Sequence, residues 1–258
     1  MSETVLYEIK GKTALITLNR PKQLNSFTGE LVDAFINSLE KAQKDVNIRC
    51  VVITGEGRAF CAGGDLEFLD TLASTNERRL FIAKVGKIVK LIYNIPKPVI
   101  AMVNGVAAGA GFNLAISCDL VFASSNAKFV QSFAKVGLSP DCGGFYHLPK
   151  IVGALKAKEL MFTADTISAQ DALQLKIVNH VVEQEQLYDQ VMGFAEAISK
   201  SAPIALEMTK KAINNSSASL DETLEFEAIA TSILLSTDDF FEGVKAFKEK
   251  RPPEFTGK

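Results

Sequence analysis

The alternation of apolar and polar positions divides the chain at about Lys150 into two parts of different character. In the first part, short apolar runs alternate with amphipathic stretches, which predicts strands separated by helices. The predicted strands cover Val5–Lys10, Thr13–Leu18, Cys50–Thr54, Val99–Val103 and Asp119–Ala123. Helices are predicted after the N-cap Thr28 and over Thr75–Tyr93, before two prolines. This order indicates an α/β core with crossover connections.

Helical periodicity dominates the second part of the chain. The predicted helices cover Ala154–Thr163, Ala169–Leu175, Gln186–Lys200, Ile204–Asn214, Leu220–Leu235 and Asp238–Lys248. Their starts are supported by capping-box patterns at Ser168-x-x-Asp171 and Ser219-x-x-Glu222 and by Pro203 at a first helical position. We therefore expect a core in residues 1–195 and a helical region in residues 196–258.

Composition narrows the classes of function. The 258 residues are 47% hydrophobic and 22% charged, and the net charge of −2 lacks the basic excess of nucleic-acid-binding proteins. No stretch approaches the roughly 18–20 apolar residues of a membrane span, and no leader-like apolar segment opens the chain. The four cysteines form no CxxC and the two histidines stand apart. We therefore expect no metal site, and reduced thiols in a cytoplasmic protein.

A segment rich in glycine and alanine, Asn104–Gly111, joins a predicted buried strand to an apolar helix. Small residues let a substrate approach the backbone closely, and the first amides of a helix have no partners inside it. The positive end of the helix dipole also favours a developing negative charge. Tight packing of strand against helix explains the same residues equally well. A nucleotide-binding loop does not, because neither GxGxxG nor GxxxxGK[ST] occurs here.

A second small-residue turn, Arg58–Leu66, also follows a buried strand, and on its own it predicts only a turn. Together, the two turns can direct two backbone amides at one carbonyl oxygen. That arrangement is an oxyanion hole, so the pair of turns predicts an active site.

The residues of both turns, with further motifs in the same order, resemble the crotonase superfamily, also called the enoyl-CoA hydratase/isomerase family. The resemblance extends over nearly the whole chain. Its motifs are Asn19-Arg20-Pro21 with Asn25, Phe60 to Leu66, Asn104 to Ala115, Cys118-Asp119, Gly137-Leu138 with Gly143-Gly144, Ser236 to Asp239, and Glu242-Gly243. The resemblance implies a spiral of ββα repeats that holds the active site in residues 1–195, followed by a helical trimerisation region in residues 196–258.

The resemblance also implies what the protein binds. The expected substrate is an acyl-CoA thioester, and no cofactor is expected beyond the coenzyme A that is part of this substrate. The expected assembly is a homotrimer or a hexamer of two trimers. The oxyanion amides are those of Ala62 and Ala110, and Arg20 and Lys22 are candidate cations for CoA phosphates, with solvated surface charge as the alternative. The expected substrate-binding residues are Arg20, Lys22, Leu24, Ala62, Gly64, Asp65, Leu66, Gly109, Gly111, Asn113 and Phe133.

The chain departs from the hydratases of this family, which use two glutamates, one to activate water and one to handle the proton delivered to carbon. Asn113 and Phe133 occupy those positions, and neither side chain is an acid or a base at neutral pH. One carboxylate remains nearby, Asp141, between Pro140 and Cys142. Its position resembles that of the acid–base aspartate in family isomerases that act on dienoyl-CoA or on a ring epoxide of phenylacetyl-CoA. Support of the turn is the alternative role.

We therefore predict a cofactor-independent acyl-CoA isomerase in which Asp141 is the acid–base residue. Apolar neighbours such as Phe133 are expected to desolvate this carboxyl and raise its pKa. The substrate is a 3-enoyl-CoA or, more specifically, a ring-epoxide phenylacetyl-CoA. The alternatives are a hydratase, lyase or hydrolase that uses water bound by Asn113, and a catalytically silent CoA-binding subunit. A nucleophilic Cys142 lacks a positioned histidine, since His147 is expected to pack under the loop.

Overall fold

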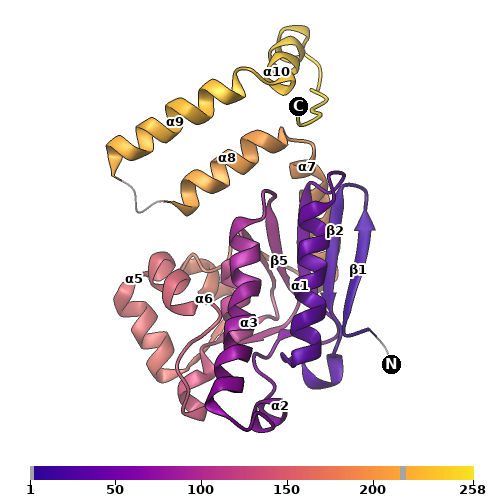
Figure 1. Cartoon of the computed structure of the whole chain (residues 1–258). Helices are drawn as coiled ribbons and strands as arrows, with labels where there is room; N and C mark the ends of the chain where they lie inside the picture. Colours follow the sequence, from indigo (N-terminus) through magenta and orange to yellow (C-terminus); the bar gives the residue numbers. More distant parts are fainter. Residues whose placement is uncertain (1–2, 216–218) are drawn as a thin grey trace.

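The structure is a computed structural model of the chain, and it describes residues 3–215 and 219–258 (Figure 1). The larger of its two sheets has the strand order β1-β2-β3-β5-β7-β10. These strands are β1 (Val5–Lys10), β2 (Thr13–Leu18), β3 (Cys50–Gly55), β5 (Val99–Val103), β7 (Leu120–Ser124) and β10 (His180–Val182). β1 and β2 form an antiparallel hairpin, and the other neighbouring pairs are parallel.

The smaller sheet has the order β4-β6-β8-β9 and consists of three-residue strands. They are β4 (Ala59–Cys61), β6 (Val106–Ala108), β8 (Lys128–Val130) and β9 (Thr166–Ser168). The chain visits the two sheets in turn, because β3 leads to β4, β5 to β6 and β7 to β8. Each pair is followed by helix: α2 (Leu66–Asp70) and α3 (Thr75–Asn94), then α4 (Ala110–Ser117), then η2 (Ser132–Val136) and α5 (Gly144–Thr163). This repetition forms a spiral of ββα units.

The smaller sheet determines where the two small-residue turns, Arg58–Leu66 and Asn104–Gly111, meet. β4, β6 and β8 are parallel neighbours, so their carboxyl ends lie at one edge of the sheet. The chain leaves these three ends through residues 62–66, 109–111 and 131–133. The spiral therefore brings together three segments that are far apart in the sequence.

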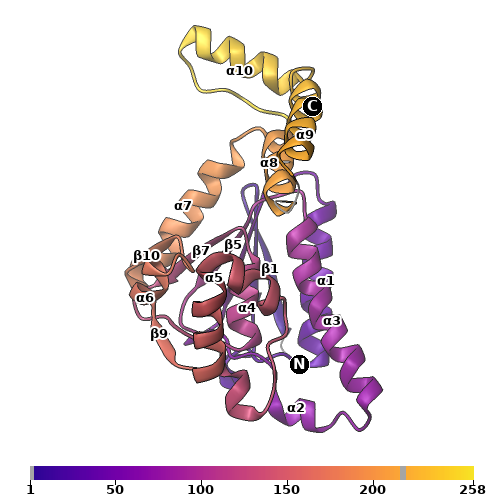
Figure 2. The same cartoon turned by 90° about the vertical axis from the view of Figure 1, so that its left-hand side faces the viewer.

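Helices cover both faces of the larger sheet. α1 (Gly29–Lys44) and α3 lie on one side, and α7 (Leu187–Ser199) lies on the other (Figure 2). On the α7 side, Leu187, Val191 and Ala195 form one apolar cluster with Val52 and Ile100 of the sheet. Burial on both faces explains why β3 and β5 are continuous apolar runs rather than alternating ones.

Three C-terminal helices, α8 (Pro203–Asn214), α9 (Leu220–Leu234) and α10 (Asp238–Glu249), extend beyond the sheets (Figures 1 and 2). Lys210 attaches α8 to the core, since its Nζ lies 2.7 Å from Asp119 Oδ2 and 2.8 Å from the carbonyl oxygen of Ile92. The predicted boundary after residue 195 falls within α7, and that division stays a prediction. Among the helices of the described residues, none combines the length and apolar character needed to cross a membrane.

Two features of the fold differ from the sequence prediction. The helix expected from Ala154 begins at Gly144 and is interrupted at Gly153, which has a φ of 76°. Pro149 and Gly153 obscure the helical periodicity of this segment. The sequence pattern also does not predict the smaller sheet, because three residues are too few to show alternation. The remaining short segments are η1 (Pro21–Gln23), α6 (Ala169–Gln174) and η3 (Gln184–Gln186).

Candidate active site

The two small-residue turns lie directly against each other. A Cβ atom added at Gly63 would lie 2.9 Å from Ala108 O and 3.2 Å from Ala110 N. One added at Gly111 would lie 2.0 Å from Cys61 O. Because these neighbours are backbone atoms that cannot move aside, glycine is required at both positions. The structure thus brings the two turns together, as the sequence predicts.

The amide predicted to line the oxyanion hole from the second turn is already bonded within the protein. The N–H of Ala62 donates to Leu24 O at 2.9 Å. A donor engaged in such a bond does not face a substrate oxygen. The predicted role of Ala62 as an oxyanion-hole donor is therefore wrong. The physical reason is that Ala62 serves to attach the 20–27 segment to the turn.

Two other backbone amides, those of Gly64 and Ala110, have no acceptor within residues 3–215 and 219–258. Phe27 donates to the carbonyl of Gly63 and accepts from the amide of Asp65, so this pairing passes over Gly64. Ala110 is the first residue of α4, where an amide lacks an intrahelical partner and lies at the positive end of the dipole. It follows Gly109, whose φ of 53° and ψ of −121° favour glycine.

Asp141 lies in the turn between η2 and α5, and its backbone carbonyl is bonded to Asn113 of α4. Burial raises the pKa of Asp141 to about 6. Its Oδ1 is buried and has no hydrogen-bond partner in the described part of the chain. The side chain does not cap α5, because that helix has no side-chain cap. A hydrogen bond from its own backbone amide lowers the pKa but does not outweigh the burial. A desolvated carboxylate is a strengthened base when ionised.

Non-acidic side chains occupy both hydratase acid positions in the structure. Asn113 is fully buried, its Nδ2 donates to Asp141 O at 2.8 Å, and its Oδ1 accepts from Gln131 Nε2 at 2.7 Å. Phe133 is buried with its ring beside Gly109, 3.6 Å from a Cβ added there. Sequence reasoning did not single out Gln131, although a glutamine directly after a strand and two residues before Phe133 is a usable signal.

The two segments expected to hold CoA are joined by an ion pair. Arg20 Nη1 lies 2.9 Å from Asp65 Oδ2 and donates to Ser26 O at 2.7 Å. Only 19% of the Arg20 side chain and 12% of the Asp65 side chain are exposed. This pairing argues against the predicted phosphate role of Arg20 and substrate role of Asp65, because each charge is compensated inside the protein. The predicted neighbours Lys22 and Leu66 are exposed, and Leu24 is half-buried.

Cys142, which the sequence offers as a candidate nucleophile, is not activated. Burial raises the pKa of the Cys142 thiol well above its ordinary range. The ring of His147 lies 3.0 Å from a Cβ added at Gly143, and burial lowers the pKa of His147 to about 4. His147 is therefore neutral at pH 7 and packs under the loop, as predicted.

All four cysteines are free thiols, and the cytoplasmic location expected from them stays a prediction. Over the described residues, no three His, Cys, Asp or Glu side chains gather as metal ligands.

Known proteins share the sequence and the fold over the full length of this chain. The 1,2-epoxyphenylacetyl-CoA isomerase of Escherichia coli (strain K12) is 37% identical over 262 residues, covering 100% of both chains. A crotonyl-CoA hydratase of Syntrophomonas wolfei is 37% identical over 258 residues, covering 99% of each. A crystal structure of an enoyl-CoA hydratase from Bacillus anthracis has a TM-score of 0.95 at 33% identity, covering 99% of this chain and 100% of that one.

The structural similarity confirms the α/β crotonase fold with C-terminal helices that the sequence predicts. A sequence model of the family described as enoyl-CoA hydratase/isomerase matches residues 8–258. This chain therefore belongs to the enoyl-CoA hydratase/isomerase family, as an enzyme that acts on acyl-CoA thioesters.

Proposed function

We propose that the protein is an acyl-CoA isomerase that uses Asp141 as its single acid–base residue. One observation carries the proposal. Asp141 is the carboxyl group of the site with a raised pKa and an unpartnered buried oxygen, whereas both hydratase acid positions hold residues that transfer no proton. One carboxylate is enough for a proton shift and not enough for the two tasks of hydration.

The proposed reaction moves one proton and one double bond. Ionised Asp141 takes a proton from the α-carbon of a 3-enoyl-CoA, and the electron pair moves onto the thioester oxygen to give an enolate. The amides of Gly64 and Ala110, in place of the Ala62 and Ala110 pair, stabilise that oxygen. Protonated Asp141 then returns the proton to the γ-carbon, which yields the 2-enoyl-CoA and regenerates the carboxylate. Phe133 limits the access of water to the enolate.

A ring-epoxide phenylacetyl-CoA is the second candidate substrate. It is favoured by the 37% identity to an enzyme named 1,2-epoxyphenylacetyl-CoA isomerase. The same elements serve both substrates, because each reaction begins with electron flow into the thioester carbonyl. Lys22, an exposed cation two residues before Leu24, whose carbonyl is bonded to Ala62, is our candidate for a CoA phosphate. Leu24 and Leu66 are the proposed apolar contacts of the CoA moiety.

Hydration remains the main alternative, since a relative at the same 37% identity is named crotonyl-CoA hydratase. The bonds of Asn113 count against it. Both polar ends of its amide already hold a protein partner, Asp141 O and Gln131, and an amide cannot take a proton from an attacking water. A silent CoA-binding subunit would not require a buried carboxylate oxygen without a partner.

The test compares wild type with Asp141→Asn, which keeps the shape of the side chain and removes the base. Conversion of 3-hexenoyl-CoA and exchange of its α-proton in D2O should both fall by about 10²–10⁴-fold in the variant, the usual contribution of a positioned base. The dissociation constant for butyryl-CoA should change little. Persistence of isomerase activity in Asp141→Asn would show that Asp141 is not the base. Hydration of crotonyl-CoA without any isomerase activity would reverse the assignment.

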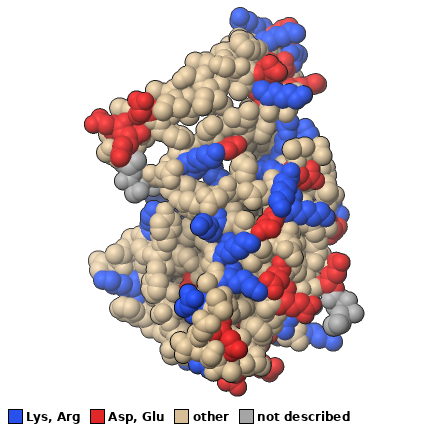
Figure 3. Space-filling model, in the orientation of Figure 1, with Lys and Arg blue, Asp and Glu red and all other residues tan. Residues whose placement is uncertain are grey.

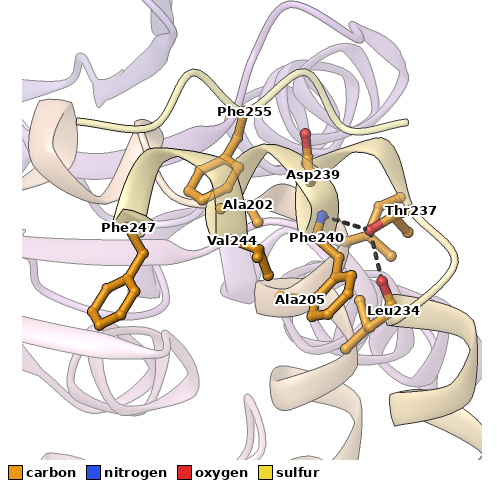
Figure 4. Close-up of a pocket in the computed structure, with 11 residues that line it drawn as sticks. Ala202, Ala205, Leu234, Thr237, Asp239, Phe240, Val244, Phe247 and Phe255 are labelled. Carbon is orange, nitrogen blue, oxygen red and sulfur yellow. Dashed lines mark hydrogen bonds between the residues drawn. The ribbon is translucent and has the colours of Figure 1, made fainter. Parts of the chain in front are cut away.

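We also propose that the protein assembles as a trimer, alone or paired into a hexamer, through its C-terminal helices. The proposal is supported by the apolar surface of α8, α9 and α10. Figure 3 shows few charged side chains along the middle of α9. Figure 4 shows the rings of Phe240, Phe247 and Phe255 around a pocket of about 410 Å³ on α8 and α10. A contiguous apolar region of this kind typically marks a surface that another chain covers.

A further inference from the structure

The buried amide of Asn113 holds the backbone of the residue that we propose as the base. The carbonyl oxygen of Asp141 accepts two hydrogen bonds, one from Asn113 Nδ2 at 2.8 Å and one from the amide of Gly144 at 2.9 Å. Asn113 belongs to α4, the helix whose first amide is that of Ala110. The same short helix therefore contacts both the base and the oxyanion site.

The orientation of the amide is fixed by its surroundings. A peptide carbonyl only accepts hydrogen bonds, so the NH2 group of Asn113 must face Asp141 O. The Oδ1 of Asn113 then requires a donor, and Gln131 supplies it through Nε2 at 2.7 Å. Both side chains are buried, with exposures of 0% and 1%. The two amides thus form a directed chain from the end of β8 to the Asp141 turn.

The turn that this chain supports has an unfavourable backbone. Cys142 has a φ of 48° and Gly143 a φ of 75°, so two consecutive residues adopt the left-handed region that side-chain-bearing residues rarely enter. Gly144 is also shaped around Asn113, because a Cβ added there would lie 2.4 Å from Nδ2. A strained turn keeps its shape only where its surroundings hold it, and Asn113 is the side chain in contact with its carbonyl.

We propose that Asn113, supported by Gln131, is a positioning residue that keeps the Asp141 carboxylate in its desolvated place. This inference rests on the proposed function of Asp141. Asn113 touches no reacting atom in this role. It acts by holding the 141–144 turn, so that the carboxylate stays buried instead of swinging towards water. Asn113 stands where the family's hydratases have a glutamate. Its amide donates the bond to Asp141 O that the proposed single-base reaction needs.

The central test is Asn113→Leu, a substitution of similar volume that removes the donor. We expect kcat for 3-hexenoyl-CoA to fall by about 10–100-fold, the scale of a small misplacement of a reacting group. KM should stay within about twofold. The acid limb of kcat/KM, which reports the base in the free enzyme, should move from about 6 towards the ordinary aspartate value of about 3.9. A merely structural role would not move that limb.

Two further variants make the result interpretable. Gln131→Met leaves the donor of Asn113 in place but frees its oxygen, and should give a smaller change in the same direction. Asn179→Leu is the control: the exposed Asn179 accepts from the amide of Val121 in β7, so its loss should leave the pH profile unchanged. If Asn113→Leu does not fold, Asn113→Ala, which adds no atoms, is measured in the same way.

The outcomes separate this inference from the proposed function. A wild-type kcat and acid limb in the Asn113 variant, with Asp141→Asn inactive, would overturn the positioning role and leave Asp141 as the base. A change in KM alone would also overturn it, because it would indicate a substrate contact. Full activity of Asp141→Asn would reject the proposed function itself, whatever the Asn113 variant does.

Discussion

At the scale of single residues, the catalytic role that we propose for Asp141 conflicts with the stability of the folded protein. A carboxyl group whose pKa is raised by burial prefers to be neutral in the folded protein, yet a base must be ionised to act. The unfolded chain solvates the same carboxylate freely. At neutral pH, folding therefore works against the ionisation of Asp141, and the fold has to tolerate this cost to keep an effective base.

This conflict predicts that Asp141→Asn stabilises the protein above pH 6. The folded pKa of about 6 exceeds the unfolded value of about 3.9, so the stability associated with the neutral carboxyl is complete below pH 4 and is lost as the pH rises to 6. The Asp141→Asn variant does not lose this stability, because its amide does not ionise. Its advantage in unfolding free energy should be about 2–3 kcal/mol at pH 8 and near zero at pH 4.

Urea unfolding of both proteins at pH 4 and pH 8 measures this difference. Asp70→Asn is the control, because the exposed Asp70 keeps its water in the folded protein. A gap that is equal at the two pH values would contradict the desolvation of Asp141 and point to a packing effect of the amide instead.

At the scale of elements, close contacts between turns make the site possible. β4 and β6 are neighbours, and α4 begins directly after β6 with its glycine at position 111 against Cys61 O. The approach is so close that any side chain at Gly111 separates the two turns. The same separation would move the amides of Gly64 and Ala110 apart.

Gly111→Ala is therefore expected to lower the unfolding free energy by about 3 kcal/mol or more, since the added Cβ meets backbone atoms at 2.0 Å. Gly86→Ala is the matched control on α3. Nothing lies within 4 Å of a Cβ added there, and the exposed helical site should gain about 0.5–1 kcal/mol. Thermal and urea unfolding of both variants measure the contrast. Equal effects would mean that the turns are not in contact.

The elements also show what the sequence reveals and what it hides. Five strands of the larger sheet and the capped helices follow from periodicity and end signals, because these are local properties. The sixth strand, β10, has three residues and is not predicted. The three-residue strands of the smaller sheet are specified by their neighbours and leave no local pattern. The choice of Gly64 over Ala62 depends on a bond to Leu24, and the role of Asn113 depends on the distant Gln131. Such contacts appear only when the chain is folded.

At the scale of the whole molecule, the proposed active site and the exposed apolar surface belong to different parts of the chain. The core residues supply the paired turns and Asp141, while the C-terminal helices leave large apolar side chains exposed. On α9 and α10 these are Leu220, Leu224, Ile229, Ile233, Phe240, Phe241, Val244 and Phe247. In a monomer this surface would face water, at a cost of roughly 1.5–3 kcal/mol for each large side chain that could be buried.

We therefore predict that the purified protein sediments as a multiple of three 27.9 kDa chains, and that Phe241→Glu with Phe247→Glu shifts it to a smaller species. These two rings are 61% and 86% exposed. Buried charges without partners would oppose association far more than they would disturb the folded monomer. Val46→Glu, at a side chain that is 87% exposed in the loop after α1, should leave the assembly unchanged. Sedimentation equilibrium decides the matter. A double variant of unchanged mass would place the oligomer contacts elsewhere, and a monomeric wild type would exclude the proposed assembly.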